Sequence, residues 1–200
     1  MSGAILPDYY CAPITNHMLT NALRSLAASA LLVVSSSALI ACSPTYDWRT
    51  ISNNANGYSV DLPAKPGSDA RSIDVNGTPM QMHMQTAEVG GAVFVIGTLD
   101  LPNAQPATQQ KALAFLRDGL ARNVGEAPDA RTVAVPLVAG GSVPGFDMEL
   151  TGKAGAKDET RTIHARLVAK GAHAYQLAIV GREQPAVEQV DQFFQSFKLY

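Results

Sequence analysis

The sequence predicts an α+β fold: an antiparallel β-sheet with two helices packed on it, preceded by an N-terminal signal helix. Three observations support this prediction. Apolar and polar residues alternate through most of residues 46–200, two segments show helical spacing, and turn signals separate the alternating runs. The order is strands, a helix, more strands and a closing helix, which is typical of helices packed on an antiparallel sheet.

The first part of this region reads as a series of strands. Pro63 ends the second strand, and Asn76-Gly77 is a strong hairpin signal between the third and the fourth. The fifth strand is apolar at nearly every position, so we expect it to be central and covered on both faces. The expected strands are 47–52, 58–62, 70–75, 79–88 and 92–99.

A helix is expected over about residues 106–124. Pro106 suits its first turn and Gly125 its end. Its apolar residues recur at helical spacing; they are Leu113, Phe115, Leu116, Leu120 and Val124.

The chain then returns to alternating runs and ends in a second helix. The four expected strands are 131–138, 145–151, 159–169 and 173–180. Pro185 opens the closing helix. The residues expected along its packed face are Val187, Val190, Phe194 and Phe197.

Residues 18–42 have the layout of a secretory signal. Arg24 precedes an apolar or small-residue run over 26–40. This run is shorter than the about 20 mostly apolar residues that cross a bilayer. We therefore expect an export signal and not a membrane-spanning helix.

The end of that run, Leu39-Ile40-Ala41-Cys42, resembles the lipobox of bacterial lipoproteins. The resemblance implies that the Cys42 thiol receives a diacylglyceryl group, with palmitate-type acyl chains, and that a peptidase cuts between Ala41 and Cys42. An ordinary signal peptide, or an uncleaved anchor with a chance cysteine, is the alternative.

These features divide the chain into three parts. Residues 1–41 are the expected signal segment, with Met18 as the expected true start, 42–45 the lipidated tether, and 46–200 a single α+β domain. Ser43 follows the cysteine where an Asp would suggest retention in the inner membrane. By analogy with lipoproteins we expect an outer-membrane protein that faces the periplasm.

The expected domain resembles the PsbP-like family, which includes the DcrB-like lipoproteins. The resemblance depends on the strand Gly57-Tyr58-Ser59-Val60-Asp61-Leu62-Pro63, on the mid-chain helix and on the close Phe193-Phe194-Gln195-Ser196-Phe197-Lys198-Leu199. It implies a binding or assembly accessory with no shared enzymatic centre, and it assigns no functional residues.

Composition narrows the function classes. A formal net charge of −2 and a single Trp argue against a nucleic-acid partner. The cysteines, Cys11 and Cys42, both precede the expected domain, so that domain holds no disulfide or thiolate metal site. No phosphate-binding loop, dinucleotide fingerprint or calcium loop occurs, and we expect no cofactor and no metal.

The run Met80-Gln81-Met82-His83-Met84 contains ligands that suit Cu(I). On a strand, however, the three methionines share one face and His83 points to the other. We therefore expect them to fill the core, and a copper-binding protein is an alternative.

A second candidate is the pair Asp147 and Glu149 facing His164 and Arg166. In a hairpin about residues 154–156, Asp147 falls near His164 and Glu149 near Thr162. A carboxylate beside a histidine is half of a general-base arrangement, which makes a hydrolase using His164 and Asp147 an alternative. An exposed charge ladder is the structural interpretation and the one that we favour.

The leading hypothesis is a non-enzymatic lipoprotein of the cell envelope, held on the membrane by lipid on Cys42. We expect it to serve as a binding or assembly accessory with an envelope protein partner. The sequence leaves its ligand and its oligomeric state open.

Overall fold

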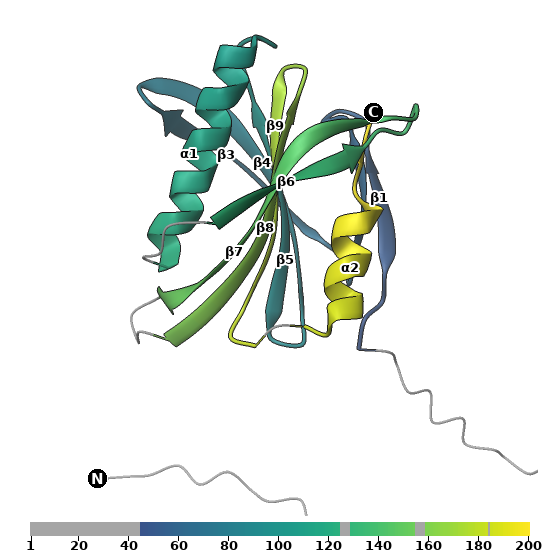
Figure 1. Cartoon of the computed structure of the whole chain (residues 1–200). Coiled ribbons are helices and arrows are strands. Elements are labelled where there is room, and N and C mark those ends of the chain that lie inside the picture. Colours follow the sequence, from purple (N-terminus) through teal and green to yellow (C-terminus); the bar gives the residue numbers. More distant parts are fainter. Residues whose placement is uncertain (1–44, 125–128, 155–158, 184) are drawn as a thin grey trace, which may run out of the picture. The chain divides into compact units, whose positions relative to one another are not determined.

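The computed structural model describes residues 45–124, 129–154, 159–183 and 185–200, so the predicted signal helix, the lipobox and Cys42 lie outside the described residues. The described part is mostly antiparallel β-sheet with two helices (Figure 1). The helices are α1 (Pro106–Val124) and α2 (Val187–Ser196). The strands are β1 (Arg49–Asn53), β2 (Tyr58–Leu62), β3 (Gly67–Val75), β4 (Thr78–Val89), β5 (Ala92–Asp100), β6 (Asp129–Pro136), β7 (Ser142–Ala154), β8 (Glu159–Lys170), β9 (His173–Gly181) and β10 (Lys198–Leu199).

The strands form two sheets where the sequence predicted one. The large sheet has the order β3-β4-β5-β9-β8-β7-β6, and every neighbouring pair is antiparallel. The small sheet has the order β1-β2-β10. Strand β10 was not predicted from the sequence, because two residues are too few to show an alternating pattern. Val138 N donates to Leu199 O at 2.8 Å and so joins the end of β6 to this small sheet.

The predicted hairpin between β3 and β4 is confirmed. Val75 pairs with Thr78 across a two-residue turn. Asn76 and Gly77 both have positive φ angles, 53° and 85°. Such angles match the strand twist in a tight hairpin, which explains why an Asn-Gly pair stands there.

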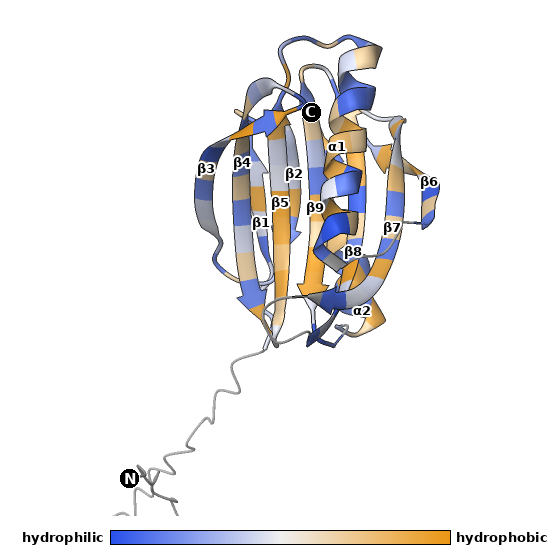
Figure 2. Ribbon diagram, turned by 90° about the vertical axis from the view of Figure 1, so that its left-hand side faces the viewer, coloured by the Kyte–Doolittle hydropathy of each residue, from blue (hydrophilic) through white to orange (hydrophobic). Residues whose placement is uncertain are grey.

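Both faces of the large sheet are covered. Helix α1 contacts β7, β8 and β9 on one face, and α2 lies with the small sheet on the other (Figure 1). Figure 2 shows hydrophobic residues along much of β5 and β9, at the middle of the sheet. Phe94 and Leu99 of β5 are both 0% exposed and belong to the cores on opposite faces, so the expectation of a central β5 is confirmed.

Helix α1 has the predicted bounds, and Leu116 and Leu120 are buried as expected. The predicted packed face of α2 is partly wrong. Val187 is 70% exposed, whereas Phe193, which the prediction omitted, is fully buried. The ring of Phe193 meets Phe94 of β5 edge-on with centroids 5.4 Å apart, so Phe193 and not Val187 belongs to the packed face of α2.

Candidate functional site: a groove between the large sheet and α2

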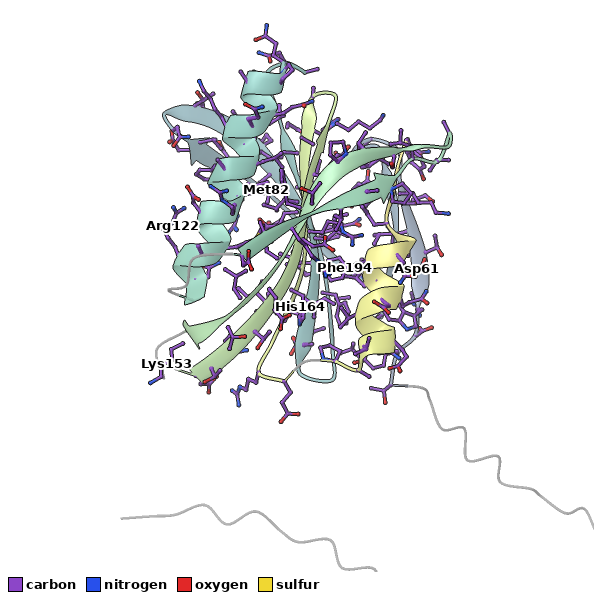
Figure 3. All side chains as sticks on the ribbon, in the orientation of Figure 1. Asp61, Met82, Arg122, Lys153, His164 and Phe194 are labelled. Atoms are coloured by element: carbon purple, nitrogen blue, oxygen red, sulfur yellow. The ribbon has the colours of Figure 1, made fainter. Side chains whose placement is uncertain are left out.

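A groove of about 720 Å³ lies between α2 and the strands β6, β7 and β8; we call it the sheet–helix groove. Figure 3 labels His164 on the sheet side of the groove and Phe194 on the helix side. The sheet side of the groove carries one imidazole and five charged side chains: His164, Asp129, Arg131, Asp147, Glu149 and Arg166. The residues from α2 are Val190, Asp191, Phe194 and Gln195.

Contacts with the small sheet hold α2 in place as one wall of the groove. The backbone N–H of Asp61 donates to Ser196 Oγ at 2.8 Å near the end of the helix. The indole N–H of Trp48 donates to Gln189 Oε1 at 3.1 Å near its start. Together with the buried ring of Phe193, these contacts give the groove one wall of fixed position.

Two rows of side chains cross the sheet side of the groove. In one, Glu149 of β7 lies between Asp129 of β6 and His164 of β8. In the other, Asp147 of β7 lies between Arg131 of β6 and Arg166 of β8. Residues two apart on a strand share a face, so both rows point toward α2.

The predicted pairing of Asp147 with His164 and of Glu149 with Thr162 is therefore wrong by two residues. The last pair of the hairpin joins Ala154 to Glu159, so the connection spans residues 155–158 and not 154–156. A shift of two residues keeps every side chain on its predicted face and changes only its partner.

Arg166 and Asp147 form a two-pronged ion pair at the floor of the groove. Arg166 Nε donates to Asp147 Oδ1 at 2.6 Å and Nη2 donates to Oδ2 at 2.9 Å. Arg166 Nη1 donates to the backbone oxygen of Phe194 at 2.8 Å, and the guanidinium lies 5.2 Å from the centre of the Phe194 ring. The two side chains are 12% and 15% exposed. This pair therefore joins β7, β8 and α2, and Asp147 is committed to Arg166.

His164 lies beside Glu149, with Nε2 3.7 Å from Glu149 Oε1. That distance exceeds a hydrogen bond, and Nε2 is buried without a hydrogen-bond partner among the described residues. The imidazole is 19% exposed and the Glu149 carboxylate 58% exposed. A ring nitrogen in this position can accept or donate a proton to a group that enters the groove.

The described lining of the groove contains no Ser, Thr, Cys, Tyr or Lys side chain. The hydrolase hypothesis placed His164 and Asp147 in one concave site, and both do line the groove. However, the carboxylate beside His164 is Glu149 and not Asp147. The described arrangement offers charged and hydrogen-bonding groups around a base, without a hydroxyl, thiol or amine side chain next to it.

The methionines of β4 lie as the core hypothesis expects. Met82 is 7% exposed and belongs to the core under α1, and Met80 and Met84 are partly buried against that core. His83 points to the other face, where Nε2 is 3.0 Å from Asp100 Oδ2. Among the described residues, no group of three or more His, Cys, Asp or Glu side chains has an arrangement that could hold a metal ion.

Sequence reasoning missed a polar cluster centred on Asp100. His173, the first residue of β9, lies with Nε2 3.6 Å from Asp100 Oδ1, and His83 contacts the other carboxylate oxygen. The hydroxyl of Tyr175, on the same strand as His173, donates to Asn56 O at 2.9 Å. Burial raises the pKa of Tyr175 to about 12, with smaller contributions from Tyr58 and Asp100. The pairing of β9 with β5 was not predicted from the sequence, and that pairing places His173 opposite Asp100.

The chain matches no protein-family model, and no curated protein matches it. Within the described residues, neither helix is long and apolar enough to cross a membrane. The resemblance to the PsbP-like family therefore stays a prediction from the sequence.

Proposed function

We propose that this protein is a lipid-anchored lipoprotein of the cell envelope whose domain binds a ligand or partner in the sheet–helix groove. The observation that carries the binding role is the groove itself. It has a volume of about 720 Å³, within the range of about 300–1,000 Å³ typical of ligand pockets. Its walls are fixed by buried contacts, and its lining combines an aromatic ring with several charged groups.

Binding explains the groove better than catalysis does. The floor pair Arg166–Asp147 is already neutralised and connected to α2, so it serves to shape the groove. The remaining charged groups, Glu149 and Asp191 among them, stand where they can contact a ligand. Binding sites of this kind place a few polar groups around apolar surface to orient what they hold.

The anchor is proposed from the sequence. The lipobox Leu39-Ile40-Ala41-Cys42 implies a diacylglyceryl group on Cys42, and each buried CH₂ contributes about 0.8 kcal/mol of membrane affinity. Two acyl chains hold a protein stably, whereas a single chain binds only marginally. The tether 42–45 would keep the groove close to the bilayer, at the periplasmic face of the outer membrane.

Amide hydrogen exchange tests the binding role. We expect the amides of β6 and α2 to exchange more slowly in isolated envelopes than in the full chain purified in detergent, with α1 unchanged. Gln195→Trp, which fills the groove, should abolish the difference. Val187→Trp is the matched control, because Val187 is on the same helix, is exposed and does not line the groove. Equal exchange in the two preparations would reject the groove as an occupied site.

A hydrolase is the second candidate, and one observation favours it. His164 Nε2 lines the groove without a hydrogen-bond partner and lies 3.7 Å from a carboxylate, so it could activate a water molecule. This candidate predicts ester hydrolysis that His164→Gln removes and His83→Gln leaves intact. Hydrolysis that survives His164→Gln would reject it.

A further inference from the structure

The charges around the groove are not balanced. The described lining holds four carboxylates, on Asp129, Asp147, Glu149 and Asp191, against the two guanidiniums of Arg131 and Arg166. These carboxylates and guanidiniums together carry a formal net charge of −2. Arg166 forms an ion pair with Asp147. Arg131 is 82% exposed and lies 3.8 Å from the same carboxylate.

The excess negative charge stands on both walls. Asp129 and Glu149 are directly opposite each other on neighbouring strands. Asp191 lines the same groove from α2, and neither Asp129 nor Asp191 forms an ion pair within 4 Å in the described structure. A cation between these walls would contact carboxylates from both sides.

The groove also provides apolar surface beside these carboxylates. The Phe194 ring and the side chains of Val190 and Val133 line it. A long basic side chain presents the matching chemistry, because its methylene stem packs on apolar surface while its charged head reaches a carboxylate.

The open edge of β6 borders the groove. In the described part of the chain β6 is the outermost strand of the large sheet, and over Asp129–Ala134 its far edge has no strand partner. Such an edge presents backbone N–H and C=O groups that an extended peptide can pair with. A strand added there would lie about 4.8 Å from β6, within reach of the groove for a lysine or arginine side chain.

We propose that the sheet–helix groove binds an extended, lysine- or arginine-bearing polypeptide segment that pairs with the edge of β6. Its basic side chains would enter between Glu149 and Asp129 on the sheet and Asp191 on α2. This inference rests on the proposed binding function and names the chemistry of the partner.

The test measures binding of a fluorescent peptide of alternating lysine and valine to the full chain in detergent. We expect saturable binding that Glu149→Gln and Asp191→Asn each weaken about tenfold. Glu88→Gln is the matched control, because Glu88 is an exposed strand carboxylate that does not line the groove, and its variant should bind as the wild type does. Affinity should fall as salt is added.

Three outcomes would overturn the inference. The first is no binding of the lysine–valine peptide, and the second is equal binding of a glutamate–valine peptide. The third is full retention of affinity in Glu149→Gln and Asp191→Asn. Spermidine competing as strongly as the peptide would reject strand pairing at β6 and assign the groove to free polyamines. Slower exchange of β6 and α2 in envelopes, alongside any of these results, would keep the groove as a binding site while removing its proposed ligand.

Discussion

Arg166 on β8 donates hydrogen bonds to both carboxylate oxygens of Asp147 on β7, and the same guanidinium donates to the backbone oxygen of Phe194 on α2. The pair thus joins two strands to the helix that faces them. The pair forms the floor of the sheet–helix groove. Asp147 therefore pairs with Arg166 and not with His164. The acidic residues that remain around the floor give the groove its negative character.

Arg166→Met should lower the free energy of unfolding by about 3 kcal/mol, because it leaves the Asp147 carboxylate buried without its partner. The double variant with Asp147→Leu should cost less than the sum of the two single changes. Arg131→Met, at an 82% exposed side chain, is the control and should cost less than about 0.5 kcal/mol. Urea unfolding measures all of these, and additive costs in the double variant would contradict the coupling.

Phe193→Ala should destabilise the domain by about 3–5 kcal/mol, because the ring is fully buried and packs edge-on against Phe94. The same change at an exposed position of α2, Val187→Ala, should have almost no effect. Thermal or urea unfolding distinguishes the two. If Val187 proved the costlier site, the packed face assigned to α2 would be wrong.

Gly145→Ala should destabilise the protein by about 1–3 kcal/mol or more. An added Cβ would lie 2.9 Å from the backbone oxygen of Leu167 and 2.8 Å from Val135 Cγ2, and neither can move freely inside the sheet. Gly97→Ala should cost less, because its closest contact is the flexible end of Met82. The order of the two unfolding midpoints tests this, and a reversed order would contradict it.

Stability should fall as the pH rises from about 10 to 12, with a contribution from Tyr175 of about 2–3 kcal/mol. Burial raises the pKa of Tyr175 from 10.0 in the unfolded chain to about 12, so the folded state holds its proton longer. The stabilisation is complete below the lower value and is lost above the upper one. Tyr175→Phe, which cannot ionise, should flatten the alkaline decline in urea midpoints. An unchanged decline in that variant would assign the effect to other groups.

Local signals predicted much of the fold. Asn76-Gly77 located the first tight hairpin, and the spacing of Leu116 and Leu120 located α1, because such patterns depend only on residues near in sequence. The burial of Phe193 instead depends on Phe94, which is far away in the chain. That contact produces no pattern in the residues near Phe193 in the sequence, so the packed face of α2 was predicted only in part.

For the candidate site, the sequence predicted which face of the sheet its residues share but not which residues pair. Alternation along β7 and β8 puts Asp147, Glu149, His164 and Arg166 on one side, and the structure agrees. It does not decide which residues pair, since a two-residue shift preserves the alternation. The position of α2 over that face depends on the small sheet, which short segments such as β10 form without a recognisable pattern.

We propose that lipid on Cys42 holds the domain on a membrane. A soluble Cys42→Ser form should retain the fold, because the described strands and helices begin only at Arg49, and should leave the membrane fraction.

The most direct measurement is mass spectrometry of the N-terminal peptide of the protein extracted from envelopes. We expect a mature chain that begins at Cys42 and carries a diacylglyceryl group on its thiol. A mature chain that begins elsewhere, or an unmodified Cys42 thiol in the membrane fraction, would contradict it.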